Sequence, residues 1–398
     1  MPRRRSSNLQ LIGTLIIIVI AGVYFATNAL KSPSQPAQPT QLTQATQPVE
    51  LTAAPTGAAG SSASLGWLTV YFTNPDPPDN IGHGIDTYVQ SAIDGAAKSI
   101  DVTSFDLNLP NLVNALGSAS KRGVKVRVVY DGTNGSQVLN NGLTQNKDFD
   151  AIATLKAAGI GLVDGGRSNG LMHDKMVIVD GKTLFMGSWN LSYNDTYRNN
   201  NNLLKITDPQ IIANYQAKFN ELFVDKKFGT HAVVKALNPV MTIAGTAVEN
   251  YFSPPDGVMD KLIKYVQGAK KSVHYMIFTF TDENLAAAMI DRAKAGLDVQ
   301  GVIEDRGATE GALVSLYCAK TPVKTDGNKY TMHHKVIIID GQFVITGSFN
   351  FTKSADDAND DNALIIHSPA IAAQYEQEYQ RVNSIAVTPK AADIKCSK

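Results

Sequence analysis

The sequence predicts an α/β protein made of two related halves, with mixed sheets flanked by helices, preceded by a membrane-spanning helix and a flexible linker. Three observations predict this organisation: an uncharged apolar run near the amino end, a polar low-complexity stretch after it, and a strand–helix pattern that occurs twice in the remainder. Hydrophobic residues make up 43% of the 398 residues and charged residues 18%, so the chain can bury an ample core.

The amino end has the features of an exported protein. Residues 9–30 contain no charge and no proline, and about 20 apolar residues in a helix cross the hydrocarbon core of a bilayer. The tail before them, residues 1–8, contains three consecutive arginines, which favour the cytoplasmic side and direct the rest of the chain across the membrane. A cleaved signal peptide is the alternative, because it shares the basic start, and it would release a secreted protein. Both interpretations place the body of the chain outside the cytoplasm.

Residues 31–66 are expected to be a flexible linker. They consist mainly of Pro, Gln, Thr, Ala and Ser, with almost no charge and few large apolar side chains. Such a segment cannot bury enough surface to offset the entropy lost on ordering, so it predicts a tether between the membrane helix and the folded halves.

The remainder repeats one order of elements: strand, helix, strand, helix, strand. We expect these at 68–73, 85–97, 98–102, 109–121 and 124–131 in the first half, and at 248–253, 259–269, 271–275, 283–295 and 297–305 in the second. Self-similarity over this length indicates a duplicated domain, because solenoid repeats are much shorter. The halves are predicted to span 67–230 and 245–388, with the join near 230–245.

One motif occurs once in each half with identical spacing. It consists of a histidine, a lysine two residues later, an aspartate five residues after the lysine, and a Gly-Ser-x-Asn sequence that starts seven residues after the aspartate. Its polar members are His173, Lys175, Asp180, Ser188 and Asn190 in the first half, and His333, Lys335, Asp340, Ser348 and Asn350 in the second. Two matched copies in equivalent places are beyond coincidence for residues of ordinary frequency.

The spacing explains how these side chains would meet. In a strand, residues two apart share a face, so His173 and Lys175 point the same way, as do Ser188 and Asn190. An Asp-Gly pair between two apolar runs predicts a tight hairpin turn. Each hairpin then presents an imidazole, an ammonium, a hydroxyl and an amide, which are groups that hold a phosphate and attack it. Displacement at a phosphodiester needs a nucleophile and an acid on opposite sides, so two facing halves predict one complete site.

The doubled motif resembles the HKD motif of the phospholipase D superfamily, and the similarity covers roughly residues 67–385. The resemblance implies a pseudo-twofold pair of α/β halves with one shared active site that uses no metal and no cofactor. It also implies that one histidine forms a covalent phosphohistidine while the other protonates the departing alcohol. The second histidine then activates water, or another alcohol, to release the phosphoryl group.

The resemblance assigns roles position by position. The catalytic motif residues are His173, Lys175, Asp180, His333, Lys335 and Asp340. The two aspartates lie at the predicted turns, so we expect their role to be mainly structural. Contacts to the substrate phosphate are expected from Ser188, Asn190, Ser348 and Asn350.

The two halves differ at a position that orients a histidine in the family. Members often carry an acid eleven residues after the asparagine of the Gly-Ser-x-Asn sequence, which is Asp361 in the second half but the uncharged Asn201 in the first. A carboxylate raises the pKa of a nearby histidine and fixes its tautomer. We therefore hypothesise that His333, paired with Asp361, is the protonated general acid and that His173 is the nucleophile. An acid can also orient a nucleophile, and phosphate trapped on His333 would reverse the assignment.

A few other polar residues are candidates for the site or for structural roles. His334 should face away from its neighbour His333, because adjacent strand residues point to opposite faces. His274 lies in an apolar strand and fits a cleft or a core position equally. Asp131 and the pair Asp305–Arg306 follow strands, where they could border a cleft or cap backbone groups.

Three functions fit the motif. The first is phospholipase D-type hydrolysis of a phospholipid head-group ester, with transphosphatidylation as a related reaction. The second is a membrane-anchored or secreted metal-independent nuclease, and the third is a non-catalytic binding module, which two intact motifs disfavour. Removing the four basic residues and one acid of residues 1–66 from totals of 36 and 36 leaves 32 basic and 35 acidic residues. Because nucleic-acid binders usually show a basic excess, a phospholipid substrate is favoured over a nucleic acid.

The two cysteines, Cys318 and Cys396, fit no metal-ligand spacing. They could form a disulfide, and the sequence leaves this open.

Overall fold

The computed structural model describes residues 65–140, 143, 148–306 and 311–396. The expected cytoplasmic tail, the expected transmembrane helix and all but the end of the expected linker therefore lie outside the described residues. Within the described ranges, no helix is both long enough and apolar enough to cross a bilayer.

The first half forms a seven-stranded sheet with the strand order β1-β9-β8-β7-β2-β3-β6, and a small β4–β5 ribbon beside it. Its elements are β1 (Leu68–Phe72), α2 (Asp86–Asp94), β2 (Ser99–Ser104), α3 (Pro110–Lys121), β3 (Lys125–Tyr130), β4 (Val138–Leu139), β5 (Phe149–Asp150), α4 (Ala151–Ala157), β6 (Gly161–Asp164), β7 (Met176–Val179), β8 (Thr183–Gly187), α5 (Tyr193–Tyr197), β9 (Asn202–Ile206) and α6 (Pro209–Asn220). A π-helical turn η2 (Glu221–Asp225) and a 3₁₀ turn η3 (Gly229–His231) follow α6.

The second half forms an eight-stranded sheet with the order β10-β11-β17-β16-β15-β12-β13-β14. Its elements are β10 (Val240–Ile243), β11 (Thr246–Ser253), α7 (Val258–Gly268), β12 (Ser272–Ile277), α8 (Glu283–Lys294), β13 (Asp298–Ile303), α9 (Ala312–Cys318), β14 (Val323–Thr325), β15 (Lys335–Ile339), β16 (Phe343–Gly347), α10 (Lys353–Asp357), β17 (Asp361–His367) and α11 (Pro369–Ile385). Apart from the additional strand β10, the order of strands is the same as in the first sheet.

Both sheets are mixed, as predicted. β2 pairs in parallel with β3, and β3 with β6, whereas β7, β8, β9 and β1 pair antiparallel. The second sheet repeats this pattern, with β12, β13 and β14 parallel and β15, β16, β17 and β11 antiparallel. The expected α/β fold with two sheets flanked by helices is confirmed.

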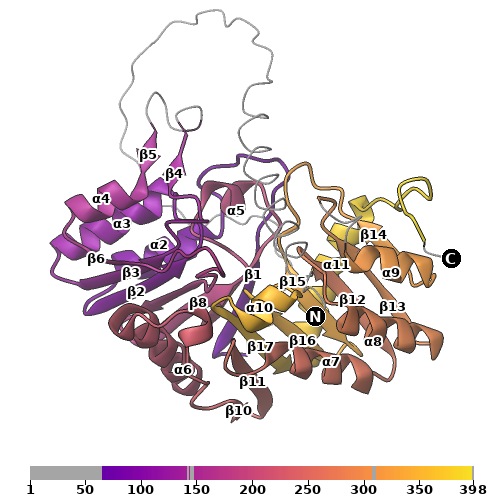
Figure 1. Ribbon diagram of the computed structural model, residues 1–398. Helices are drawn as coiled ribbons and strands as arrows, with labels where there is room; N and C mark the ends of the chain where they lie inside the picture. Colours follow the sequence, from indigo (N-terminus) through magenta and orange to yellow (C-terminus); the bar gives the residue numbers. More distant parts are fainter. Residues whose placement is uncertain (1–64, 141–142, 144–147, 307–310, 397–398) are drawn as a thin grey trace, which may run out of the picture. The chain divides into compact units, whose positions relative to one another are not determined.

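Three apolar cores hold these layers together. Side chains alternate along β7, so Met176 and Ile178 join a central core while Val177 and Val179 pack toward the helices on the other face. The central core contains residues of both sheets together with α6 and α11. Figure 1 shows α2, α3 and α4 on the face of the first sheet opposite α6, and the second sheet has a separate core under α7, α8 and α9. The shared central core holds the two sheets in one unit.

Isolated backbone bridges join the two halves at two matching places. Met172 bridges to Asp360, and Asn200 bridges to Met332, both in parallel orientation. In each case the residue after the methionine donates its N–H to the carbonyl oxygen of the bridge partner at 2.9 Å. The second motif lies 160 residues after the first, and shifting residue numbers by this amount converts one set of contacts into the other. The halves are therefore related by an approximate twofold axis.

Buried polar side chains follow the same symmetry. The amide of Asn202 donates to the hydroxyl of Tyr375 at 2.7 Å, and the hydroxyl of Tyr215 donates to the amide oxygen of Asn362 at 3.1 Å. Both bonds join a strand that follows the motif in one half to the last long helix of the other half. They satisfy polar groups in the central core, where an unpaired group would be costly.

One buried charge pair reverses its polarity between the halves. In the second half, His334 on the motif segment bonds Glu378 on α11 at 2.8 Å. At the matching positions of the first half, Asp174 lies within electrostatic reach of Lys218 on α6. Lys218 also pairs with Glu221 at 3.0 Å and with Asp360 at 3.3 Å. The strand carries the acid in one half and the base in the other.

The predicted hairpin turn is present in both motifs. Asp180 and Gly181, like Asp340 and Gly341, have positive φ angles, which Asp and Gly tolerate better than most residues. The carboxylate of Asp180 accepts N–H groups from three consecutive residues, 97–99, at 2.7 to 3.0 Å. Asp340 holds residues 270–272 in the same way, at 2.7 to 3.0 Å. These bonds pin the hairpin end to the start of β2 or β12.

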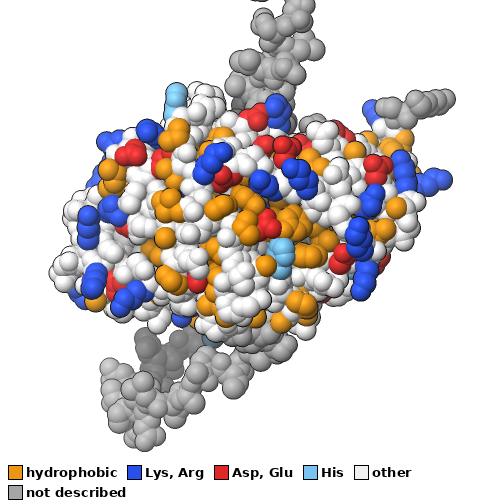
Figure 2. Space-filling model, turned by 90° about the horizontal axis from the view of Figure 1, so that it is seen from below, with side chains coloured by type: hydrophobic (Ala, Val, Ile, Leu, Met, Phe, Trp, Pro, Cys, Tyr) orange, Lys and Arg blue, Asp and Glu red, His pale blue; other side chains and the backbone are white. Residues whose placement is uncertain are grey.

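The segment that connects the halves exposes apolar residues. Val224, Val233, Leu237 and Val240 are 61% to 66% exposed and lie between η2 and β10. Figure 2 shows a face on which hydrophobic side chains gather near the middle.

Near the carboxyl end of the chain, a disulfide joins Cys318, at the end of α9, to Cys396. This bond answers the question that the cysteine spacing left open.

Candidate active site

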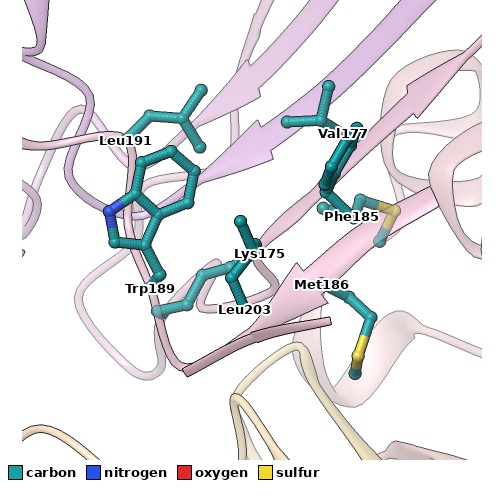
Figure 3. Close-up of a pocket in the computed structure, with 8 residues that line it drawn as sticks. Lys175, Val177, Phe185, Met186, Trp189, Leu191 and Leu203 are labelled. Carbon is teal, nitrogen blue, oxygen red and sulfur yellow. The ribbon is translucent and has the colours of Figure 1, made fainter. Parts of the chain in front are cut away.

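The motif lysines are buried, and the ammonium group of each bonds the backbone two residues before it. Lys175 donates from Nζ to the carbonyl oxygen of His173 at 2.7 Å, and Lys335 donates to that of His333 at 2.8 Å. The stem of Lys175 is surrounded by apolar side chains (Figure 3), among them Trp189. Burial lowers the pKa of Lys175 to about 8, although nearby carboxylates, led by Asp361, oppose the shift. Burial and the charge of Lys175 hold the pKa of Lys335 well below its usual value.

Each histidine and lysine pair also contacts one phenylalanine. Phe105 meets the His173 ring edge-on at a centroid distance of 5.3 Å, and Nζ of Lys175 lies 5.7 Å from its centroid. Phe278 repeats this, at 4.6 Å from the His333 ring and 4.4 Å from Nζ of Lys335. Cation–π contact of this kind stabilises a partly desolvated ammonium. Both phenylalanines directly follow a strand, β2 or β12, and this shared place in the repeat was an available signal that our sequence analysis did not use.

The histidine partners are exchanged between the halves. Nδ1 of His173 lies 2.7 Å from Oδ1 of Asp361, which belongs to the second half. Nδ1 of His333 lies 2.9 Å from Oδ1 of Asn201, which belongs to the first half. The hypothesis that His333 pairs with Asp361 is therefore wrong. Motif spacing indicates which residues each half contributes, but it does not show that the twofold axis places each contribution beside the opposite histidine.

The exchange brings both motifs to one buried site. His173 is 4% exposed and His333 is 7% exposed. Burial and the lysine charges lower the pKa of His333 well below its usual value, and the charge of His173 contributes in the same direction. Burial also lowers the pKa of His173, while Asp361 opposes the shift. Because Nδ1 of each ring is engaged, Nε2 is the nitrogen of each ring that is available for chemistry.

The motif serines hold the residues that orient the histidines. Ser188 donates to Oδ1 of Asn201 at 2.8 Å, and Ser348 donates to Oδ1 of Asp361 at 2.6 Å. Their hydroxyl protons are thus directed at the orienting residues. Contact of Ser188 and Ser348 with a phosphate stays a prediction.

The two motif asparagines have different surroundings. Asn190 donates from its amide to Asp195 at 2.7 Å and accepts the N–H of Asp106 at 3.3 Å. Asn350 is also buried, and its amide oxygen has no hydrogen-bond partner among the described residues. Phosphate contact by either one stays a prediction.

The motif aspartates lie at the hairpin turns and bond the backbone there. Asp180 and Asp340 lie at the far ends of the hairpins, where they accept backbone N–H groups. Partial burial would raise the pKa of Asp180, but these backbone bonds outweigh it and hold the pKa below its usual value. These bonds agree with the mainly structural role that we expect from their position at the turn, and their place among the catalytic motif residues stays a prediction.

Acids at the ends of β3 and β13 hold the backbone just before each histidine. Asp131 accepts the N–H of Met172 at 3.0 Å, and Glu304 accepts the N–H of Met332 at 2.7 Å. Asp131 thus caps backbone groups, which was one of its two expected roles. Glu304, rather than the neighbouring pair Asp305–Arg306, is its counterpart in the second half, and the sequence analysis overlooked it.

Two other histidines lie away from the site. His334 bonds Glu378 and faces α11, as its place next to His333 in a strand predicted. His274 pairs with Glu376 at 2.9 Å and Asp298 at 3.1 Å, so it is a paired structural residue and not part of the cleft. Among the described residues, no group of three or more His, Cys, Asp or Glu side chains could hold a metal ion.

Two carboxylates beside the site were missed by the sequence analysis. Asp195 on α5 is 3% exposed, and its Oδ2 lies 3.6 Å from Nδ1 of His333. Asp106 follows Phe105, and burial together with the charge of Asp195 raises its pKa to about 7. Neither belongs to the motif, but residue-by-residue alignment of the two halves places Ala355 opposite Asp195, and this difference was a usable signal.

Two duplicated halves that bring two histidines and two lysines to one centre define a phosphodiesterase-type fold and site. The chain belongs to the phospholipase D superfamily: residues 89–223 and 262–383 match the family described as "Cardiolipin synthase, PLD-like domain". The matched segments fall one in each half and together cover more than half of the chain.

Named relatives and solved structures are similar to this chain, including the three that follow. It is 29% identical over 164 residues to a protein named phospholipase D from Rickettsia prowazekii, which covers 40% of this chain and 80% of the relative. It is 31% identical over 129 residues to the mitochondrial cardiolipin hydrolase of Xenopus laevis, which covers 32% of this chain and 61% of the relative. The phosphatidylserine synthase of Haemophilus influenzae superposes with a TM-score of 0.64 at 13% identity, over 84% of this chain and 90% of that one, and so shares the fold.

Proposed function

We propose that the protein is a phospholipase D-type phosphodiesterase that hydrolyses a phospholipid head-group ester through a phosphohistidine. One observation carries the proposal: two imidazoles from different halves have Nδ1 held by an acceptor of the opposite half, at 2.7 and 2.9 Å. A histidine held in this way has a fixed tautomer and a directed second nitrogen, which a nucleophile or a proton carrier needs.

His173 is the proposed nucleophile, and the reason is that Asp361 pairs with His173 rather than with His333. Its Nε2 attacks phosphorus, and the ring becomes positively charged when the P–N bond forms. The carboxylate of Asp361 at Nδ1 stabilises that charge, whereas Asn201 offers only a neutral amide to His333. Burial lowers the pKa of His173, so the ring is neutral and ready to attack near neutral pH.

His333 is the proposed proton carrier. As the P–O bond to the head group breaks, Nε2 of His333 donates a proton to the leaving oxygen. The same nitrogen then accepts a proton from water, whose oxygen attacks phosphorus and breaks the P–N bond to His173. An alcohol in place of water would complete transphosphatidylation. Lys175 and Lys335 are the proposed ligands of the non-bridging oxygens throughout.

A phospholipid is the proposed substrate, and the outside of the cytoplasmic membrane is the proposed location. The uncharged run 9–30 behind three arginines supports a membrane anchor, with secretion after signal cleavage as the alternative. The disulfide between Cys318 and Cys396 supports export, because disulfides persist mainly in oxidising compartments. The names of the relatives support a phospholipid, and the lack of basic excess in the folded halves disfavours a nucleic acid.

A substrate comparison tests the proposal. The full-length protein would be given phosphatidylcholine vesicles, cardiolipin vesicles, single-stranded DNA and double-stranded DNA, each with a chelator present. Release of head group or phosphatidate, with intact DNA, is the expected result. Cleavage of DNA alone would establish the nuclease alternative, and binding without turnover of any of them would establish a binding module.

A further inference from the structure

The two halves carry their site carboxylates at different places. In the second half the carboxylate is Asp361, and the residue six positions before it is Ala355. In the first half these matching positions hold Asn201 and Asp195, so the acid lies at the earlier of the two positions instead of the later one. Each half still places a buried carboxylate near the histidine of the opposite half, Asp361 near His173 and Asp195 near His333.

Asp195 is held by neutral donors from two asparagines, and Lys175 and Lys335 lie within its electrostatic reach. Its Oδ2 accepts the N–H of Asn190 at 3.0 Å and the side-chain amide of the same residue at 2.7 Å. Its Oδ1 accepts the amide of Asn199 at 2.6 Å. Neutral donors of this kind stabilise an ionised carboxylate in a buried position without neutralising it.

The carboxylate is directed to the oriented side of His333. Oδ2 of Asp195 lies 3.6 Å from Nδ1 of His333, the nitrogen that Asn201 already holds at 2.9 Å. Asn201 also donates from its amide to the backbone oxygen of Asp195 at 3.1 Å, so the two residues form one rigid unit behind the ring. A negative charge this close to a buried imidazole favours the protonated ring.

The largest influences on the pKa of His333 act against protonation. Burial, the charges of Lys335 and Lys175, and the rings of His173 and His334 all lower the pKa of His333. The ring must nevertheless carry a proton if it is to protonate a leaving group. Asp195 is the carboxylate at its oriented nitrogen, where the family pattern would place an acid at position 201.

We propose that Asp195 is a positioning residue that assists His333 as the general acid by favouring the protonated ring, in place of the missing carboxylate at position 201. The inference rests on the proposed function, because it assigns a proton donor within that site. Asn201 fixes the ring and Asp195 supplies the charge, so the first half divides between two residues what Asp361 does alone in the second half.

The test transfers the carboxylate from position 195 to position 201. The full-length variants D195A and D195A/N201D would be compared with the wild type, because the double variant copies the Ala355 and Asp361 pattern that the second half already folds with. A matched control is D356N on α10, whose carboxylate holds the N–H of Met259 at 3.0 Å and contacts neither histidine. Each protein would be assayed on short-chain phosphatidylcholine and on bis(para-nitrophenyl) phosphate across a range of pH.

The expected results depend on the leaving group. Choline is a poor leaving group that needs a proton, whereas para-nitrophenolate departs without one, so D195A should lose about tenfold to hundredfold on the lipid and little on the aryl ester. Removing the carboxylate lowers the pKa of His333, so the limb of kcat/KM that falls as pH rises should move to lower pH. D195A/N201D should recover both the lipid rate and the position of that limb, and D356N should change neither.

Contrary results are equally distinct. Equal losses on both substrates with an unmoved pH profile, or no recovery in the double variant, would show that Asp195 is merely structural. Movement of the acid limb instead would show that His333 is not the proton donor. Failure of the proposed function looks different: the wild type would release no choline, or H333A would retain wild-type turnover. If the wild type and H333A behave as proposed and only D195A does not, the inference alone fails.

Discussion

At matching positions the first half carries Asn201 and the second half carries Asp361, yet both side chains hold a histidine of the other half through an oxygen atom. The backbone contacts that bring them there are almost identical, since both bridges are followed by an N–H bond of 2.9 Å. The duplicated fold therefore preserves geometry while the charge at each histidine changes. The difference teaches that two copies of one motif can be built alike and still give their histidines different partners.

Substitution of the two motif histidines should have the largest effect on turnover. Replacing either His173 or His333 with alanine should reduce phospholipid turnover by about 10⁴-fold or more, because the two residues act as a unit. H334Q is the matched control, since His334 bonds Glu378 and faces away from the site. Steady-state choline release measures the effect. Loss in only one of the two alanine variants would contradict a shared site.

The reversed charge pair should make the halves unequal in stability. K218M removes the cation that balances Asp174, Glu221 and Asp360, so it should lower the free energy of unfolding by about 3–5 kcal/mol. E378Q should lower it by only about 1–2 kcal/mol, because burial lowers the pKa of His334 and leaves a neutral ring. Urea unfolding of both variants measures the difference. A larger loss for E378Q would show that the two pairs are not equivalent positions with reversed roles.

The orienting residues should also respond unequally to exchange. D361N should slow phospholipid turnover by about 100-fold, because the positive charge formed on His173 loses its carboxylate. N201D should change turnover by less than about tenfold, since Asp195 already supplies a charge at His333 and a second carboxylate is repelled by the first. Single-turnover rates compare the two. Equal losses would mean that both histidines depend on their partners in the same way.

The lysines give the smallest expected effect, and it depends on pH. The pKa of Lys175 is lowered to about 8, so the ammonium loses its proton as pH rises through that value. KM for an anionic phospholipid should therefore rise a few-fold between about pH 7 and pH 9, while K175R, which stays charged, should show a flatter profile. A KM that is constant over this range in the wild type would contradict the assigned pKa.

The sequence carried most of the fold and the chemical groups of the site. Identical spacing of His173 and His333 with their lysines predicted the duplication, and the Asp-Gly pairs predicted the turns. These features are local, because period and turn chemistry act over a few residues. The two mixed sheets followed from the repeated order of strands and helices.

The partners of the histidines could not be predicted from the same pattern. Asp361 lies 188 residues from His173, and only the approach of the two halves in space brings them together. Asp195 and Phe105 lie outside the motif, so only a comparison of the two halves, and not the spacing of the motif, could have indicated them. Glu304 was not considered, because the neighbouring pair Asp305–Arg306 was the candidate for the end of that strand. Tertiary contact, rather than local preference, decides each of these.

The number of phosphoryl groups that one polypeptide can hold during turnover tests the shared centre most directly. Rapid acid- or base-quenched samples of the wild type, taken with labelled phospholipid and analysed by mass spectrometry, would count and locate phosphohistidines. The account predicts at most one per molecule, on Nε2 of His173, and none on His333. Two per molecule, or label on both rings, would show two independent centres and contradict the account.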